Sequence, residues 1–148
     1  MEYNGTGAVQ VLSRLPFPTL AKMPPKPEVS RRILVADDDV DTVETLSILL
    51  KRLGHDVMVT TDPAAVLSLA VLRRPELILL DIGMPGLDGW ELARQLRQAL
   101  GYDAVRIVAV TGRAEREAFE KSRQAGFDAH VTKPVDLALV QSMLAEIR

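Results

Sequence analysis

The sequence predicts an α/β protein in which a parallel, five-stranded sheet lies between helices. From residue 31 to residue 148, short apolar runs alternate with segments of helical periodicity. Five such alternations imply right-handed crossovers within one parallel sheet. The third run, residues 77–80, is apolar at every position, as expected for a strand that helices cover on both faces. The length of 148 residues suits a single domain.

The predicted elements are bounded by residues that suit their ends. Gly54 and Gly126 follow two of the helices, because glycine favours the position after a helix. Asp62, Asp88 and Asp136 precede helices and can accept hydrogen bonds from the free amides of the first turn. In chain order we predict strand 33–36, helix 40–53, strand 55–60, helix 63–72, strand 77–80, helix 89–100, strand 106–110, helix 113–125, strand 129–132 and a final helix after Asp136.

Composition and charge exclude several classes of function. Hydrophobic residues make up 47% and charged residues 26% of the chain, and the net charge is −2, which gives no basic footprint for nucleic acid or an anionic membrane. The chain has no cysteine, so disulfides, thiolate metal sites and cysteine nucleophiles are excluded. No apolar run approaches the roughly 20 residues of a membrane span. We therefore expect a cytoplasmic protein without membrane insertion or direct nucleic-acid binding.

The first thirty residues differ from the rest of the chain. Five of the nine prolines lie there, without a sustained strand or helix pattern. Such composition favours a flexible arm or linker over residues 1–30. An apolar cluster between residues 9 and 20 leaves a second interpretation open, a short helix docked on a partner. The folded domain is predicted to cover residues 31–148.

Polar side chains follow four of the predicted strands, at the edge where ligands bind in parallel α/β sheets. They are Asp37, Asp38, Asp39, Asp81, Thr111 and Lys133. Taken singly, each has an ordinary interpretation as a solvated turn, a helix cap or a surface lysine. Taken together, converging carboxylates repel one another unless a cation compensates, and Mg²⁺ is a hard cation that prefers oxygen ligands. An ammonium such as that of Lys133 also offsets the repulsion. Because Pro134 follows, the peptide bond between Lys133 and Pro134 is more often cis than other peptide bonds.

The residues around these strand ends resemble the receiver domain of the two-component response-regulator family. The resemblance covers about 118 residues, from 31 to 148, and rests on four blocks in the family's order. They are Ile-Leu-Val-Ala-Asp-Asp-Asp at 33–39, Leu-Leu-Asp-Ile-Gly-Met-Pro-Gly-Leu-Asp-Gly at 79–89, Val-Thr-Gly at 110–112 and Gly-Phe-Asp-Ala-His-Val-Thr-Lys-Pro at 126–134. The resemblance implies a flavodoxin-like (βα)5 fold with strand order 2-1-3-4-5.

The resemblance also implies roles for individual residues. Asp81 would be the phosphoacceptor, and Asp37 and Asp38 would bind Mg²⁺, or Mn²⁺ in its place, together with Asp81. The backbone carbonyl of Gly83 would complete the protein ligands of the metal. Lys133 would pair with a phosphoryl oxygen.

Of three further assignments, those of Thr111 and His130 concern the switch. Thr111 would hydrogen-bond another phosphoryl oxygen, while Asp39 is a helix cap. His130 stands where the family usually has Tyr or Phe. We favour a half-buried ring that fills the aromatic's place over a phosphoryl donor or metal ligand, and an imidazole there can make the switch pH-sensitive.

The implied function is a phosphorylation-dependent signalling switch and not a turnover enzyme. A sensor histidine kinase or a histidine phosphotransfer protein would supply the phosphoryl group. A downstream protein target would read the face formed by helix 113–125, strand 129–132 and the last helix. Because no output domain follows in this sequence, we expect a stand-alone receiver or a piece of a hybrid kinase or larger regulator.

Three alternatives belong to other classes of function. A nucleotide enzyme needs a glycine-rich loop after the first strand, where this chain has carboxylates. A hydrolase of the haloacid dehalogenase type needs an Asp at position 83, which is Gly. The remaining alternative is a receiver-fold interaction module that is not phosphorylated.

Overall fold

The computed structural model describes residues 23–25, 29–112 and 116–147, without the side chains of residues 116–119 and 122. Its elements are β1 (Arg32–Ala36), α2 (Val40–Arg52), β2 (Asp56–Thr60), η2 (Pro63–Ala65), α3 (Val66–Arg73), β3 (Leu77–Asp81), α4 (Gly89–Leu100), β4 (Arg106–Thr111), α5 (Arg116–Ala125), β5 (Ala129–Thr132) and α6 (Leu137–Ala145). The strands of this part of the chain form one parallel sheet in the order β2-β1-β3-β4-β5. The predicted fold and strand order are therefore confirmed.

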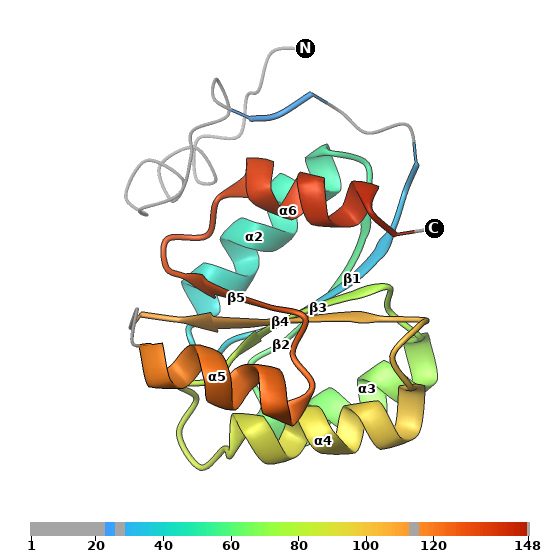
Figure 1. Cartoon of the computed structure of the whole chain (residues 1–148). Coiled ribbons are helices and arrows are strands. Elements are labelled where there is room, and N and C mark those ends of the chain that lie inside the picture. The colour runs from blue at the N-terminus through green and yellow to red at the C-terminus, as the bar shows by residue number, and fades with distance from the viewer. Residues whose placement is uncertain (1–22, 26–28, 113–115, 148) are drawn as a thin grey trace.

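Helices cover both faces of the sheet, so the core has two layers. Figure 1 shows α2 and α6 on one face and α3, α4 and α5 on the other. Successive residues of a strand point to opposite faces, so Ile33 and Val35 join the α2/α6 layer while Leu34 and Ala36 join the other layer. Burial on both faces explains why the strands are apolar at nearly every position.

The caps that define the helices are those expected from the sequence. The side chains of Asp62, Asp88 and Asp136 each accept a hydrogen bond from a main-chain amide of the turn that follows. One prediction needs correction, because the helix expected over 63–72 begins as the 3-10 turn η2 and becomes α-helical only at Val66. The start of the helix predicted at residue 113 lies outside the described residues.

Strand register brings the predicted site residues to one edge of the sheet. Asp81 ends β3 beside Val110 of β4, and Thr111 pairs with Thr132 of β5. Main-chain hydrogen bonds continue beyond the strands, from the Ile82 amide to the Val110 carbonyl at 3.1 Å and from the Lys133 amide to the Thr111 carbonyl at 2.7 Å. The loops that carry the polar side chains are thus fastened to the sheet.

Candidate functional site

The end of β1 supplies two carboxylates with different surroundings. The Asp37 side chain is buried and its Oδ1 accepts a hydrogen bond from the Asp39 amide at 2.9 Å. Asp38 is exposed. Asp39 points into α2, where its carboxylate accepts from the Asp41 amide and from the Thr42 hydroxyl at 2.7 Å. Asp39 is therefore the N-cap of α2, as predicted, and leaves Asp37 and Asp38 at the sheet edge.

Asp81 is the last residue of β3 and is buried. Its Oδ1 accepts a hydrogen bond from the Gly83 amide at 2.8 Å, which fixes the orientation of the carboxylate. A Cβ atom at Gly83 would lie 3.2 Å from the same oxygen. Glycine at this position thus allows the main chain to approach the carboxylate closely.

Lys133 joins the carboxylates that follow β1 and β3. Its Nζ lies 2.8 Å from Asp37 Oδ2 and 3.2 Å from Asp81 Oδ2. The peptide bond between Lys133 and Pro134 is cis, in line with the expectation from the sequence. Residues 37, 81 and 133, which lie just after β1, at the end of β3 and just after β5, therefore meet as predicted.

The arrangement of the carboxylates suits a hard divalent cation. One oxygen each from Asp37, Asp38 and Asp81 lies within 4.8 Å of the others. Oxygen ligands from carboxylates are those that Mg²⁺ prefers, and Mn²⁺ takes the same donors. Three carboxylates face one ammonium in this cluster, so a cation would also reduce their mutual repulsion.

The pKa values of two groups reflect this charge arrangement. Burial raises the pKa of Asp81, as does the charge of Asp37, while the Gly83 amide and Lys133 oppose the rise only in part. Burial alone would lower the pKa of Lys133, but its contacts with Asp37 and Asp81 outweigh burial and the pKa is raised. Lys133 is therefore held as an ammonium at neutral pH.

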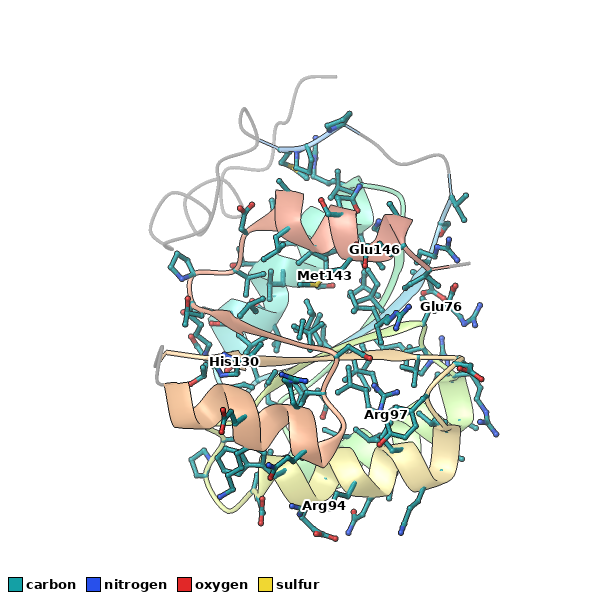
Figure 2. The ribbon with its side chains drawn as sticks, viewed as in Figure 1. Glu76, Arg94, Arg97, His130, Met143 and Glu146 are labelled. Atoms are coloured by element: carbon teal, nitrogen blue, oxygen red, sulfur yellow. The ribbon has the colours of Figure 1, made fainter. Side chains whose placement is uncertain are left out.

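The two residues predicted to take part in switching lie on β4 and β5. Thr111 is buried at the end of β4. His130 is half-buried on β5, where it pairs in register with Ala109, and burial lowers its pKa. Figure 2 shows the ring beside the sheet on the side of α5. A half-buried ring was the favoured interpretation of His130.

Reasoning from the sequence missed the main-chain donors of the site and one contact nearby. The main-chain donors do have a sequence signal in the Asp-x-Asp and Asp-x-Gly spacings, because an Asp carboxylate often accepts a hydrogen bond from the amide two residues further on. The second is Lys121 of α5, whose Nζ lies 4.0 Å from the ring centroid of Trp90 on α4. This contact links the helix after the Asp81 loop to α5 and has no local sequence signal.

Comparison with known proteins places this site in a family. Residues 33–145 match the sequence profile of the response regulator receiver domain. The chain belongs to the response regulator receiver family. Such domains act in phosphorylation-dependent two-component signalling and bind Mg²⁺ at an acidic pocket. In this chain Asp37, Asp38 and Asp81 form an acidic cluster whose oxygens could hold such a metal ion.

Three relatives illustrate the range of proteins that contain a similar receiver. The chain is 31% identical to Protein PilH of Pseudomonas aeruginosa over 71% of the chain and 87% of that protein. It is 32% identical to the virulence sensor protein BvgS of Bordetella pertussis over 88% of the chain but only 11% of that protein.

The third relative is a solved structure with a metal ion. The receiver domain of sensor histidine kinase PA1611 from Pseudomonas aeruginosa holds a magnesium ion in its active-site cleft; it is 28% identical, with a TM-score of 0.70 over 80% of this chain and 98% of that one. Similar receivers thus occur in proteins of very different length.

None of the helices in the described part of this chain is long and apolar enough to cross a membrane.

Proposed function

We propose that this receiver accepts a phosphoryl group on Asp81 from a phosphohistidine, in a reaction that depends on a divalent cation. The observation that carries the proposal is the convergence of three carboxylates and one ammonium at the sheet edge. A sensor histidine kinase or a histidine phosphotransfer protein is the proposed donor. The proposed metal ligands are Asp37, Asp38, Asp81 and the carbonyl of Gly83, for Mg²⁺ or Mn²⁺.

The transfer follows from the orientation of the Asp81 carboxylate. One oxygen accepts from the Gly83 amide and the other contacts Lys133 Nζ, so the group is held while it attacks the phosphorus. A new O–P bond forms, the P–N bond to the donor imidazole breaks, and the imidazole leaves. Bound Mg²⁺ would neutralise charge on the transferring group, as is general in phosphoryl transfer.

Lys133 and Thr111 have separate roles in this proposal. Lys133 pairs with an oxygen of the incoming group, which replaces part of its present contact with Asp37 and Asp81. The Thr111 hydroxyl, at the end of β4, hydrogen-bonds a second oxygen. Hydrolysis of the acyl phosphate by water then returns Asp81 to its starting state.

The output is proposed to come from the face of α5, β5 and α6. Phosphorylation adds roughly −1.5 to −2 charge units and new acceptor oxygens at the sheet edge. Movement of Thr111 toward these oxygens changes the start of α5. His130 of β5 lies on the side of the sheet that α5 covers. A downstream protein would read this change.

Phosphorylation by a small donor tests the proposal. We expect the intact chain to gain the mass of one phosphoryl group when incubated with acetyl phosphate and Mg²⁺, and to gain none when the metal is chelated. Asp81→Asn should abolish the gain. Asp88→Asn is the matched control, because Asn can still cap α4, and it should leave the gain unchanged. A wild-type chain that gains no phosphoryl group would favour the non-phosphorylated interaction module.

A further inference from the structure

The segment that precedes β1 contacts the α2/α6 layer at two described places. At one end, Met23 is half-buried and packs against the core cluster that α2 and α6 form with the sheet. At the other end, the Arg31 guanidinium donates to the carbonyl of Ile147, just after α6, and to Glu76 Oε2 at 2.8 Å. Ile147 packs against the same cluster as Met23.

A second route also connects Arg31 with α6. The Arg31 amide donates to Nδ1 of the buried His55 at 3.0 Å, and His55 Nε2 lies 2.8 Å from Gln141 Oε1 on α6. Arg31 is therefore attached to the middle of α6 through His55 and to its end through Ile147. Figure 1 shows the described parts of the segment on the α2/α6 side of the molecule.

The residues at the Met23 end suit a docked segment. Pro24 and Pro25 follow Met23, and proline restricts the backbone before folding, so ordering such a segment costs less conformational entropy. Methionine is flexible and fills irregular apolar surfaces well. The flexible arm over residues 1–30 stays a prediction, within which Met23 is packed against the core cluster.

The helix under this segment needs contacts from outside. α6 has nine residues and no charged side chain, and so short a helix is not stable without tertiary packing. Leu137, Val140 and Leu144 face the core, while Leu139 is 43% exposed. Contacts with the segment before β1 add attachment at the end of α6 and on the layer that α6 shares with α2.

We propose that residues 23–25 and 29–31, here called the strap, hold α6 against α2 and the sheet through Met23 and Arg31, and that Met23 occupies surface on the α2/α6 layer. A protein that docks on this surface would have to displace Met23. The strap goes beyond the proposed function, because its contacts do not involve Asp81 or a metal. It would, however, set how easily α6 moves when the output face changes.

Hydrogen exchange of the full chain tests the strap. Met23→Asp places a charge in an apolar contact, and we expect the amides of α6 to exchange about fivefold faster, the change for losing roughly half of a methionine's burial. Amides of β1 and β3 should keep their rates. Met23→Leu should keep the slow exchange of the wild type. Val29→Asp, the matched control at a side chain that is 54% exposed, should also leave the α6 rates unchanged.

Two outcomes would overturn the strap. Unchanged α6 exchange in Met23→Asp would show that the contact holds nothing in place. Equal acceleration in every element, β1 and β3 included, would show general destabilisation instead of a local clamp. Phosphorylation by acetyl phosphate, measured on the same Met23→Asp sample and expected to match wild type, separates failure of the strap from failure of the proposed function.

Discussion

The two ends of the sheet both carry ionic groups, but they balance charge in different ways. At the end where the strands begin, Glu76 pairs with Arg31 and Arg32, and Asp128 pairs with Arg97 and Arg106. At the end where the strands finish, the described residues place three carboxylates around the ammonium of Lys133. The ionic groups named at the first end are paired with one another, while at the second end the carboxylates outnumber the cations among the described residues.

This difference separates a structural site from a reactive one. Arg97 uses every part of its guanidinium, bonding the carbonyls of Gly126, Gly101 and Val105 and the carboxylate of Asp128. Figure 2 shows Arg97 pointing from α4 toward the sheet, while Arg94 lies on the outer side of the same helix. The acidic end instead has unused carboxylate capacity, which a cation or a phosphoryl group can take up.

The largest expected effect comes from breaking the balanced end. Arg97→Met should lower the free energy of unfolding by about 3 kcal/mol, because a buried ion pair loses one partner and three carbonyls lose donors. Urea denaturation measures this loss. Arg94→Met is the matched control on α4, and its ion pair with Glu91 is half exposed, so the loss should stay below about 1 kcal/mol. Similar losses in both variants would contradict the comparison.

The acidic end should respond in the opposite direction. Asp38→Asn removes one of three clustered carboxylates, so the metal-free chain should gain about 1 kcal/mol of stability as like-charge repulsion falls. Millimolar Mg²⁺ should raise the melting temperature of the wild type but hardly that of the variant. Thermal unfolding with and without Mg²⁺ measures both effects. A metal-free variant less stable than wild type would show that the carboxylates do not repel.

Glu76 at the balanced end should give a stability difference that depends on pH. Burial alone would raise its pKa, but the Arg31 hydrogen bond, the Arg32 amide and both guanidinium charges lower it. The contribution is therefore complete above the ordinary pKa of glutamate and is lost as pH falls through the lowered value. Glu76→Gln should cost about 1 kcal/mol at pH 7 and progressively less in acid. A cost that stays constant down to strong acid would contradict this.

The smallest effect is expected at His130. Burial lowers its pKa, so the folded state favours the neutral ring and stability falls as pH drops below the ordinary histidine value. His130→Phe should make the decline in melting temperature from pH 7 to pH 5 shallower. The other histidine, His55, is present in both the wild type and the variant, so the difference between their slopes comes from position 130. Identical slopes would rule out a contribution from His130.

Most of the fold was predictable because it follows from local patterns. Strand burial appears as apolar runs, and the caps at Asp62, Asp88 and Asp136 act within three residues of their positions. The 3-10 turn at Pro63 was not predictable, because the same cap and proline suit either kind of helix. The left-handed conformation of Arg74 at the end of α3, with φ of 50°, likewise has no sequence signal, although Pro75 indicates that the helix ends there.

The two ends of the sheet differed in how far they could be predicted. The acidic residues follow strands directly, so the parallel topology alone brings Asp37, Asp81 and Lys133 together. Arg97 was missed because its partners come from separate loops and only the fold unites them. Gly126 was predicted as a helix end, but a Cβ there would also lie 2.8 Å from Arg97 Cγ. Its second role was invisible without coordinates.

Locating the phosphoryl group on the chain tests the central claim most directly. The receiver would be incubated with acetyl phosphate and Mg²⁺, reduced with borohydride to convert an aspartyl phosphate to homoserine, and mapped by peptide mass spectrometry. We predict conversion at Asp81 and at no other carboxylate. Conversion at Asp37 or Asp38, or no conversion in a chain that has gained phosphoryl mass, would contradict the assignment of Asp81 as the acceptor.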